Sequence, residues 1–137
     1  MSRLVVLDNE AVQALLDPDH PKHRRVLSHV QVVASRKRRA MALTLAVPTA
    51  VRVEAGWDRR SPACAFANSL RIADVALDTG YANAAAATRN RTQVSVADAH
   101  MGAAIRASSA SQITVVTSDP GDMRRMAGDK DITIVAI

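Results

Sequence analysis

Five acidic residues occupy positions where a carboxylate could take part in chemistry. Asp8 directly follows an apolar run at residues 3–7. Asp119 lies two residues beyond a similar run at 113–117, and Asp122 follows it closely. In sheets of parallel strands, ligands bind beyond the carboxyl ends of the strands. The positions of Asp8 and Asp119 therefore predict a site at that edge.

Two further acids share helical faces with apolar residues. Glu54, one of only two glutamates in the chain, lies three residues after Val51 and three before Trp57. Asp98 is spaced in the same way from Met101. A solvated acid would normally lie on the opposite face of such a helix. Burial of an unpaired carboxylate is costly, so both acids are expected to need a partner.

A divalent cation would satisfy this requirement. Several carboxylates brought together repel one another, which raises their pKa values, and a cation supplies the missing positive charge. Oxygen ligands without a cluster of cysteine or histidine favour Mg²⁺ or Mn²⁺ over zinc. The sequence is compatible with one ion or with two.

Helix capping explains each aspartate taken singly. Asp8 and Asp119 precede helical segments, and Pro120 fits the first turn of the second one. Ser95 and Asp98 have the spacing of a capping box, and Asp122 would complement the dipole of its helix. The hypothesis of a metal site therefore depends on the whole set, and above all on Glu54 and Asp98.

The elements that must position these acids alternate between short apolar runs and helical patterns. This alternation predicts a single α/β/α domain over residues 1–137 with a mostly parallel sheet of about five strands. Strands are expected at 3–7, 41–47, 71–77, 113–117 and 132–137. Helices are expected from 9 to about 16 and at 22–39, 48–57, 79–90, 95–108 and 120–127, with a short one after Pro62.

The composition excludes several classes of protein. The 137 residues carry 18 Lys and Arg against 13 Asp and Glu, a net charge of +5 that favours a polyanionic partner. Only three residues are aromatic, which argues against binding by base stacking. No apolar run approaches a membrane span or a signal peptide, so a cytoplasmic protein is expected. Cys64 is the only cysteine, which excludes an internal disulfide.

In order and position, these acids resemble the PIN-domain family, and more narrowly the VapC ribonuclease toxins of prokaryotic toxin–antitoxin pairs. The resemblance extends over essentially the whole chain. It implies a metal-dependent endoribonuclease with Mg²⁺ or Mn²⁺ at Asp8 and Asp98, while Glu54 and Asp119 complete the catalytic pocket. It further implies auxiliary roles for Asp122 and for the polar pair Thr117 and Ser118.

The chain departs from the family after its first acid. Members usually have a small hydroxyl residue or Asn two positions later, whereas this sequence reads Asp8-Asn9-Glu10. Asn9 could take the polar role one position early, and Glu10 either adds charge or points away. The resemblance also implies a VapB-like antitoxin and a homodimer. Residues that could hold the RNA backbone are Arg36, Arg38, Arg39, Arg124 and Arg125, which could equally form a solvated basic surface.

Two other functions remain as alternatives. A PIN domain can serve in RNA processing or as a non-catalytic RNA-binding module. A phospho-receiver domain has the same alternation of elements and a metal pocket. It would need a lysine after the fifth strand, and no lysine follows the run at 132–137.

Overall fold

The computed structural model describes residues 2–38 and 42–137. Five parallel strands form one sheet in the order β3-β2-β1-β4-β5. The strands are β1 (Arg3–Leu7), β2 (Leu43–Pro48), β3 (Ala73–Val75), β4 (Gln112–Thr117) and β5 (Thr133–Ala136). The predicted α/β class and strand number are confirmed, and the sheet is entirely rather than mostly parallel.

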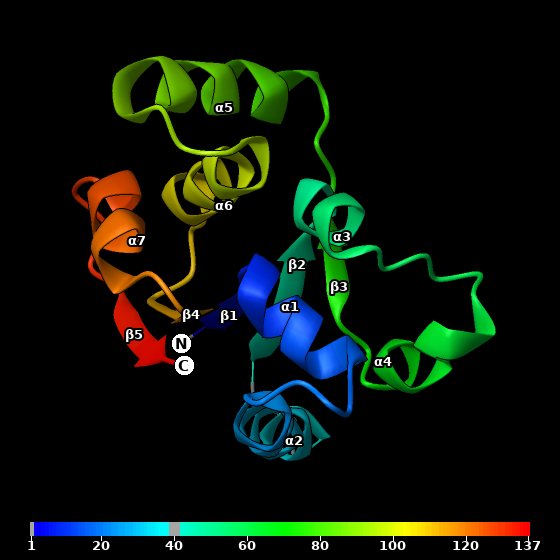
Figure 1. The fold of residues 1–137 in the computed structure, drawn as a ribbon. Coiled ribbons are helices and arrows are strands. Elements are labelled where there is room, and N and C mark those ends of the chain that lie inside the picture. Colours follow the sequence, from blue (N-terminus) through cyan, green and yellow to red (C-terminus); the bar gives the residue numbers. More distant parts are fainter. Residues whose placement is uncertain (1, 39–41) are drawn as a thin grey trace.

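Helices cover both faces of this sheet. They are α1 (Asn9–Leu16), α2 (His23–Arg38), α3 (Thr49–Ala55), α4 (Ala65–Ser69), α5 (Thr79–Thr92), α6 (Val96–Ala107) and α7 (Pro120–Ala127), with a 3₁₀ turn at Pro62–Cys64. Figure 1 shows α1 and α2 on one side of the sheet and α5 and α6 on the other. None of the helices in the described residues is long and apolar enough to cross a membrane.

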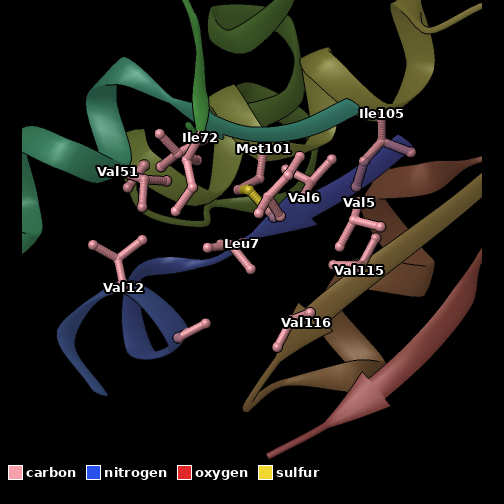
Figure 2. Close-up of a cluster of buried hydrophobic side chains, with 14 of the residues drawn as sticks. Val5, Val6, Leu7, Val12, Val51, Ile72, Met101, Ile105, Val115 and Val116 are labelled. Atoms are coloured by element: carbon pink, nitrogen blue, oxygen red, sulfur yellow. The ribbon is translucent and has the colours of Figure 1, made fainter. Parts of the chain in front are cut away.

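The central strand is buried on both faces, as expected for a parallel sheet between two helical layers. Val6 and Leu7 have no exposed surface, and Val115 and Val116 of β4 pair beside them. Met101 and Ile105 of α6 pack against these strands, and Val12 of α1 belongs to the same cluster (Figure 2). Each such side chain stabilises the fold by about 1.5–3 kcal/mol relative to exposure. This packing fixes the edge of the sheet at which Asp8 follows β1.

Strand β3 is much shorter than the predicted strand at 71–77. Arg71 has a φ of +55°, a left-handed conformation that interrupts an extended chain. At the other end, the amide of Leu77 donates to Thr49 Oγ1 (3.0 Å) rather than to a neighbouring strand. The strand is therefore limited to the three residues that pair with β2.

Candidate metal and active site

Asp8 lies at the centre of the candidate site, directly beyond β1, and is 4% exposed. Its Oδ1 accepts a hydrogen bond from the Ala11 amide (2.8 Å) and caps α1. Its Oδ2 accepts one from the Ser118 amide (3.1 Å), just beyond β4. Burial raises the pKa of Asp8, and the hydrogen bonds from Ala11, Thr117 and Ser118 oppose this effect without cancelling it. The carboxylate is thus fixed between two neighbouring strand ends.

Thr117 and Ser118 hold this arrangement together. The Thr117 side chain is fully buried, hydrogen-bonds Asp8, and accepts from the Asp119 amide through Oγ1 (2.9 Å). Ser118 contributes its backbone amide, while the residue is exposed. A hydroxyl that serves both Asp8 and the backbone of Asp119 fixes the loop after β4 relative to the first acid.

Asp98 lies in the first turn of α6, where its amide donates to Oγ of Ser95, the N-cap residue (3.0 Å). Its side chain is half-buried. Its pKa is raised from 3.8 to about 6, first by burial and then by the charges of Asp8, Glu54 and Asp122. The charges of three other predicted acids, one directly after β1, one on α3 and one on α7, therefore reach Asp98 on α6. The carboxylates repel at this edge, as expected for a site that takes a cation.

Glu54 corrects one prediction. The helical spacing placed it on the buried face of its helix, but Glu54 is exposed. Its neighbour Val53 is 82% exposed, and Val51 is the buried residue of α3. This helix has only seven residues, so the apolar spacing did not identify the face that packs inward. Glu54 nevertheless contributes to the raised pKa of Asp98, so it remains beside the site.

The two acids after β4 differ in position. Asp119 is exposed, and its Oδ1 caps α7 by accepting from the Asp122 amide (3.1 Å). Asp122 forms an ion pair with Arg125 and raises the pKa of Asp98, an effect not attributed to Asp119. The structure therefore connects Asp122 to Asp98 electrostatically, whereas it shows Asp119 as the cap of α7.

The structure shows different surroundings for Asn9 and Glu10, whose roles the sequence left open. The Glu10 carboxylate pairs with His20 Nε2 (3.1 Å) and lies 3.8 Å from Lys22 Nζ. It is thus held by the loop after α1, and its charge is the smallest contribution to the pKa of Asp8. Asn9 Oδ1 is buried and has no hydrogen-bond partner in the described residues. An unpartnered oxygen next to Asp8 leaves acceptor capacity at the candidate site.

The donor set fits a hard divalent cation. Over residues 2–38 and 42–137, no three Asp, Glu, His or Cys side chains lie close enough together to hold a metal ion by themselves. Mg²⁺ does not require such a set, because it usually retains several waters and binds one or two carboxylates. Asp8 and Asp98 are the buried and half-buried acids that could supply those two ligands. The free oxygen of Asn9 and the repulsion around Asp98 agree with this assignment.

The predicted RNA-binding arginines are scattered. Arg36 is exposed on α2, Arg38 closes that helix, and Arg39 lies outside the described residues. Arg124 and Arg125 are both exposed on α7. Since Arg125 pairs with Asp122, it is the one arginine of this set that the structure connects to the candidate site.

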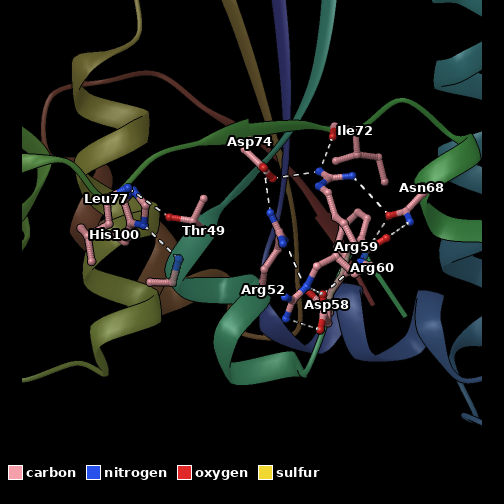
Figure 3. A network of polar contacts seen from close by, with 12 residues as sticks. Thr49, Arg52, Asp58, Arg59, Arg60, Asn68, Ile72, Asp74, Leu77 and His100 are labelled. Atoms are coloured by element: carbon pink, nitrogen blue, oxygen red, sulfur yellow. Dashed lines mark hydrogen bonds and ion pairs between the residues drawn. The ribbon is translucent and has the colours of Figure 1, made fainter. Parts of the chain in front are cut away.

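A polar network that the sequence analysis missed fixes the helix carrying Glu54 (Figure 3). Asp74 of β3 binds Arg52 Nη1 at 2.7 Å and Arg59 Nη2 at 2.8 Å. Both guanidinium groups also lie over the ring of Trp57, at 5.8 and 4.5 Å from its centroid. Residues from α3, the following loop and β3 are thereby held together. Because these residues are far apart in the sequence, no local pattern could have predicted the network.

Two buried residues near α3 have structural roles. His100 is fully buried in α6, and its Nδ1 accepts from the Ala50 amide (3.3 Å), which joins α6 to α3. Trp57 is 2% exposed.

Beside Glu54 lies an apolar cavity of about 430 Å³, which was not predicted; it is lined by Ala50, Val53, Glu54, Leu77, Val96 and Ala97.

Compared with protein-family models and with curated proteins, the chain matches none of them.

Proposed function

We propose that this protein is a metal-dependent endoribonuclease that acts as the toxin of a VapBC-type toxin–antitoxin pair. The observation that carries the proposal is the gathering of Asp8, Glu54, Asp98 and Asp122 at the carboxyl edge of a parallel sheet. Capping explains Asp8, whose Oδ1 binds α1. It does not explain the mutual repulsion that acts on Asp98, because a cap needs only one acid.

In this proposal Asp8 and Asp98 hold one or two Mg²⁺ or Mn²⁺ ions. The chemistry supplied by such an ion when bound is a lower pKa for a water and neutralisation of phosphate charge. Hydrolysis adds a water across the P–O bond: its hydroxyl joins phosphorus and a proton goes to the leaving oxygen. A carboxylate of the cluster accepts the proton that the attacking water loses. Thr117 and the Ser118 amide keep Asp8 in place throughout.

Charge and surface support the proposed substrate and partners. The net charge of +5 favours a polyanion, and RNA supplies the phosphodiester that this acid set would cleave. The apolar cavity beside Glu54 has exposed Val53 and Val96 at its walls, so a partner could cover them. We assign this role to a VapB-like antitoxin, propose that the toxin is a homodimer, and place the pair in the cytoplasm.

RNA cleavage by the purified protein tests this proposal. Total RNA is incubated with Mg²⁺ or Mn²⁺ and, separately, with EDTA, and the new ends are mapped. Asp8→Asn and Asp98→Asn should each reduce metal-dependent cleavage by at least about 100-fold, since each removes a charged ligand. Asp131→Asn is the matched control, because Asp131 is exposed and its side chain makes no hydrogen bond or ion pair with the described residues.

Cleavage that persists in EDTA, or in both site variants, would refute the metal site. RNA binding without cleavage by folded wild-type protein would instead favour the alternative, a non-catalytic RNA-binding module. Calorimetric titration with Mg²⁺ separates the two outcomes, since the nuclease requires metal binding that both variants lose and Asp131→Asn retains.

A further inference from the structure

A second cavity of about 610 Å³ lies where the ends of α5 and α6 meet the loop between α7 and β5. Its lining residues are Arg91, Arg106, Ala127, Gly128, Asp129 and Lys130. Arg91 and Arg106 belong to the last turns of their helices, and Lys130 belongs to the loop. Three cations from three separate elements thus line one hollow.

Within the described residues, no carboxylate forms an ion pair with any of these three cations. Arg106 Nη1 donates to Thr88 Oγ1 (3.3 Å) and Lys130 Nζ donates to the Ser108 carbonyl (2.7 Å), both of which are neutral groups. Arg91 is exposed, and its side chain makes no hydrogen bond or ion pair with residues 2–38 and 42–137. Asp129 lines the same cavity but likewise forms no ion pair within the described chain. Most of the donors on the three cations therefore remain free.

The simplest alternative is that these residues only compensate helix dipoles. Each helix C-terminus carries about half a negative charge, so the ends of α5, α6 and α7 together contribute about −1.5. Asp129 adds a further −1. Against the three cations, this leaves about +0.5 within the cavity. Compensation of the helix dipoles thus accounts for part of the positive charge in the cavity. The positive charge that remains can bind an anion.

We propose that this cavity binds a backbone phosphate of single-stranded RNA. The inference rests on the proposed ribonuclease function and names a contact of its substrate away from the acids. Arg106 lies eight residues after Asp98 on α6, which separates the two along the helix axis by about 12 Å. One RNA lying across α6 could therefore contact the cavity and the acid cluster together. With three aromatic residues in the chain, phosphate contacts rather than base stacking are the available means of binding.

Salt-dependent RNA binding tests this site without requiring cleavage. A 5′-labelled, mixed-sequence, single-stranded RNA is titrated with the Asp98→Asn protein, so that the probe stays intact. Arg91→Gln and Arg91→Gln/Lys130→Gln are introduced into that protein, and Arg24→Gln on α2 serves as the control because Arg24 is exposed and unpaired in the described chain. Each lost phosphate contact should lower the slope of log affinity against log salt by about 0.7. Between roughly 50 and 200 mM salt, that is about a 2.5-fold smaller loss of affinity for each contact.

The result expected is a reduced slope in the single variant, a further reduction in the double variant, and an unchanged slope in the control. Equal slopes in all four proteins, or no RNA binding by the Asp98→Asn parent, would overturn the cavity proposal. Binding of millimolar inorganic phosphate to the parent but not to the double variant, with equal RNA slopes in the two proteins, would assign the cavity to a free anion, which also overturns it. Cleavage of RNA by the wild-type protein is measured separately. Failure of the proposed ribonuclease function can therefore be distinguished from failure of the cavity proposal.

Discussion

The raised pKa of Asp98 predicts that removing its charge stabilises the metal-free protein. Between the unfolded pKa of 3.8 and the folded pKa of about 6, the folded state binds more protons than the unfolded state. The free energy of unfolding therefore falls as the pH rises through this window. Above pH 6 the folded protein holds a carboxylate that is only half-buried but is repelled by three others.

The magnitude follows from the same pKa values. Each pKa unit is worth about 1.4 kcal/mol, so the change to about 6 sets a ceiling of about 3 kcal/mol. Because the side chain is partly exposed, solvent screening reduces this to about 1.5 kcal/mol. Replacement by Asn also loses about 0.5 kcal/mol of attraction to the N-terminus of α6. Asp98→Asn should thus raise the free energy of unfolding at pH 7 by about 1 kcal/mol.

Urea unfolding in EDTA, followed by the fluorescence of the buried Trp57, measures this change. The difference between Asp98→Asn and wild type should be about 1 kcal/mol at pH 7 and close to zero near pH 4. Added Mg²⁺ should stabilise the wild type and leave Asp98→Asn unchanged, because a ligand stabilises only the state that binds it. Asp131→Asn should match the wild type throughout.

Two outcomes would refute the reasoning. Equal effects of Asp98→Asn at both pH values would mean that the substitution acts through packing rather than charge. A loss of stability at pH 7 would mean that the attraction of the Asp98 carboxylate to the N-terminus of α6 outweighs the repulsion from the other acids.

Two further substitutions test the framework around the site. Gly102→Ala should lower the free energy of unfolding by about 1–3 kcal/mol in urea denaturation, because a new Cβ would lie 2.9 Å from Met126 Cβ; unchanged stability would mean that α6 and α7 separate easily. Asp74→Asn should lower it by about 1 kcal/mol, since Arg52 and Arg59 would share a neutral amide in place of a carboxylate. A double-mutant cycle with Arg52→Gln tests this interaction. Additive changes in the free energy of unfolding would contradict coupling between Asp74 and Arg52.

Much of the fold could be predicted because its local signals are unambiguous. The bounds of β1 and α7 match the expected 3–7 and 120–127, since an apolar run ends at Asp8 and a helix begins at Pro120 before Gly128. Strand β3 was overestimated, because β-branched and apolar residues around it gave no sign of the left-handed Arg71. Backbone conformation at a single residue is not encoded in hydrophobic periodicity.

The candidate site was predictable where it follows from topology. Asp8 lies at a strand end, and that position depends only on the strand that precedes it. Glu54 was misplaced because a helix of two turns offers too few residues to define its buried face. The cavity of Arg91, Arg106 and Lys130 could not be foreseen, because three elements bring it together and no spacing relates its residues.

Helix capping and metal binding were alternative explanations of the acids in the sequence. In the structure they are compatible, because they use different lone-pair sites of the same carboxylates. Asp8 Oδ1 and Oδ2 each accept one backbone hydrogen bond, the Thr117 side chain adds a third, and a carboxylate has about four lone-pair sites. The hydrogen bonds that cap α1 and bind the loop after β4 therefore orient Asp8 without exhausting it. Asp98 differs, because repulsion from its neighbours makes its charge costly in the absence of a cation. The fold thus holds one acid rigidly and leaves the other electrostatically unsatisfied, which is the combination that favours cation binding over capping alone.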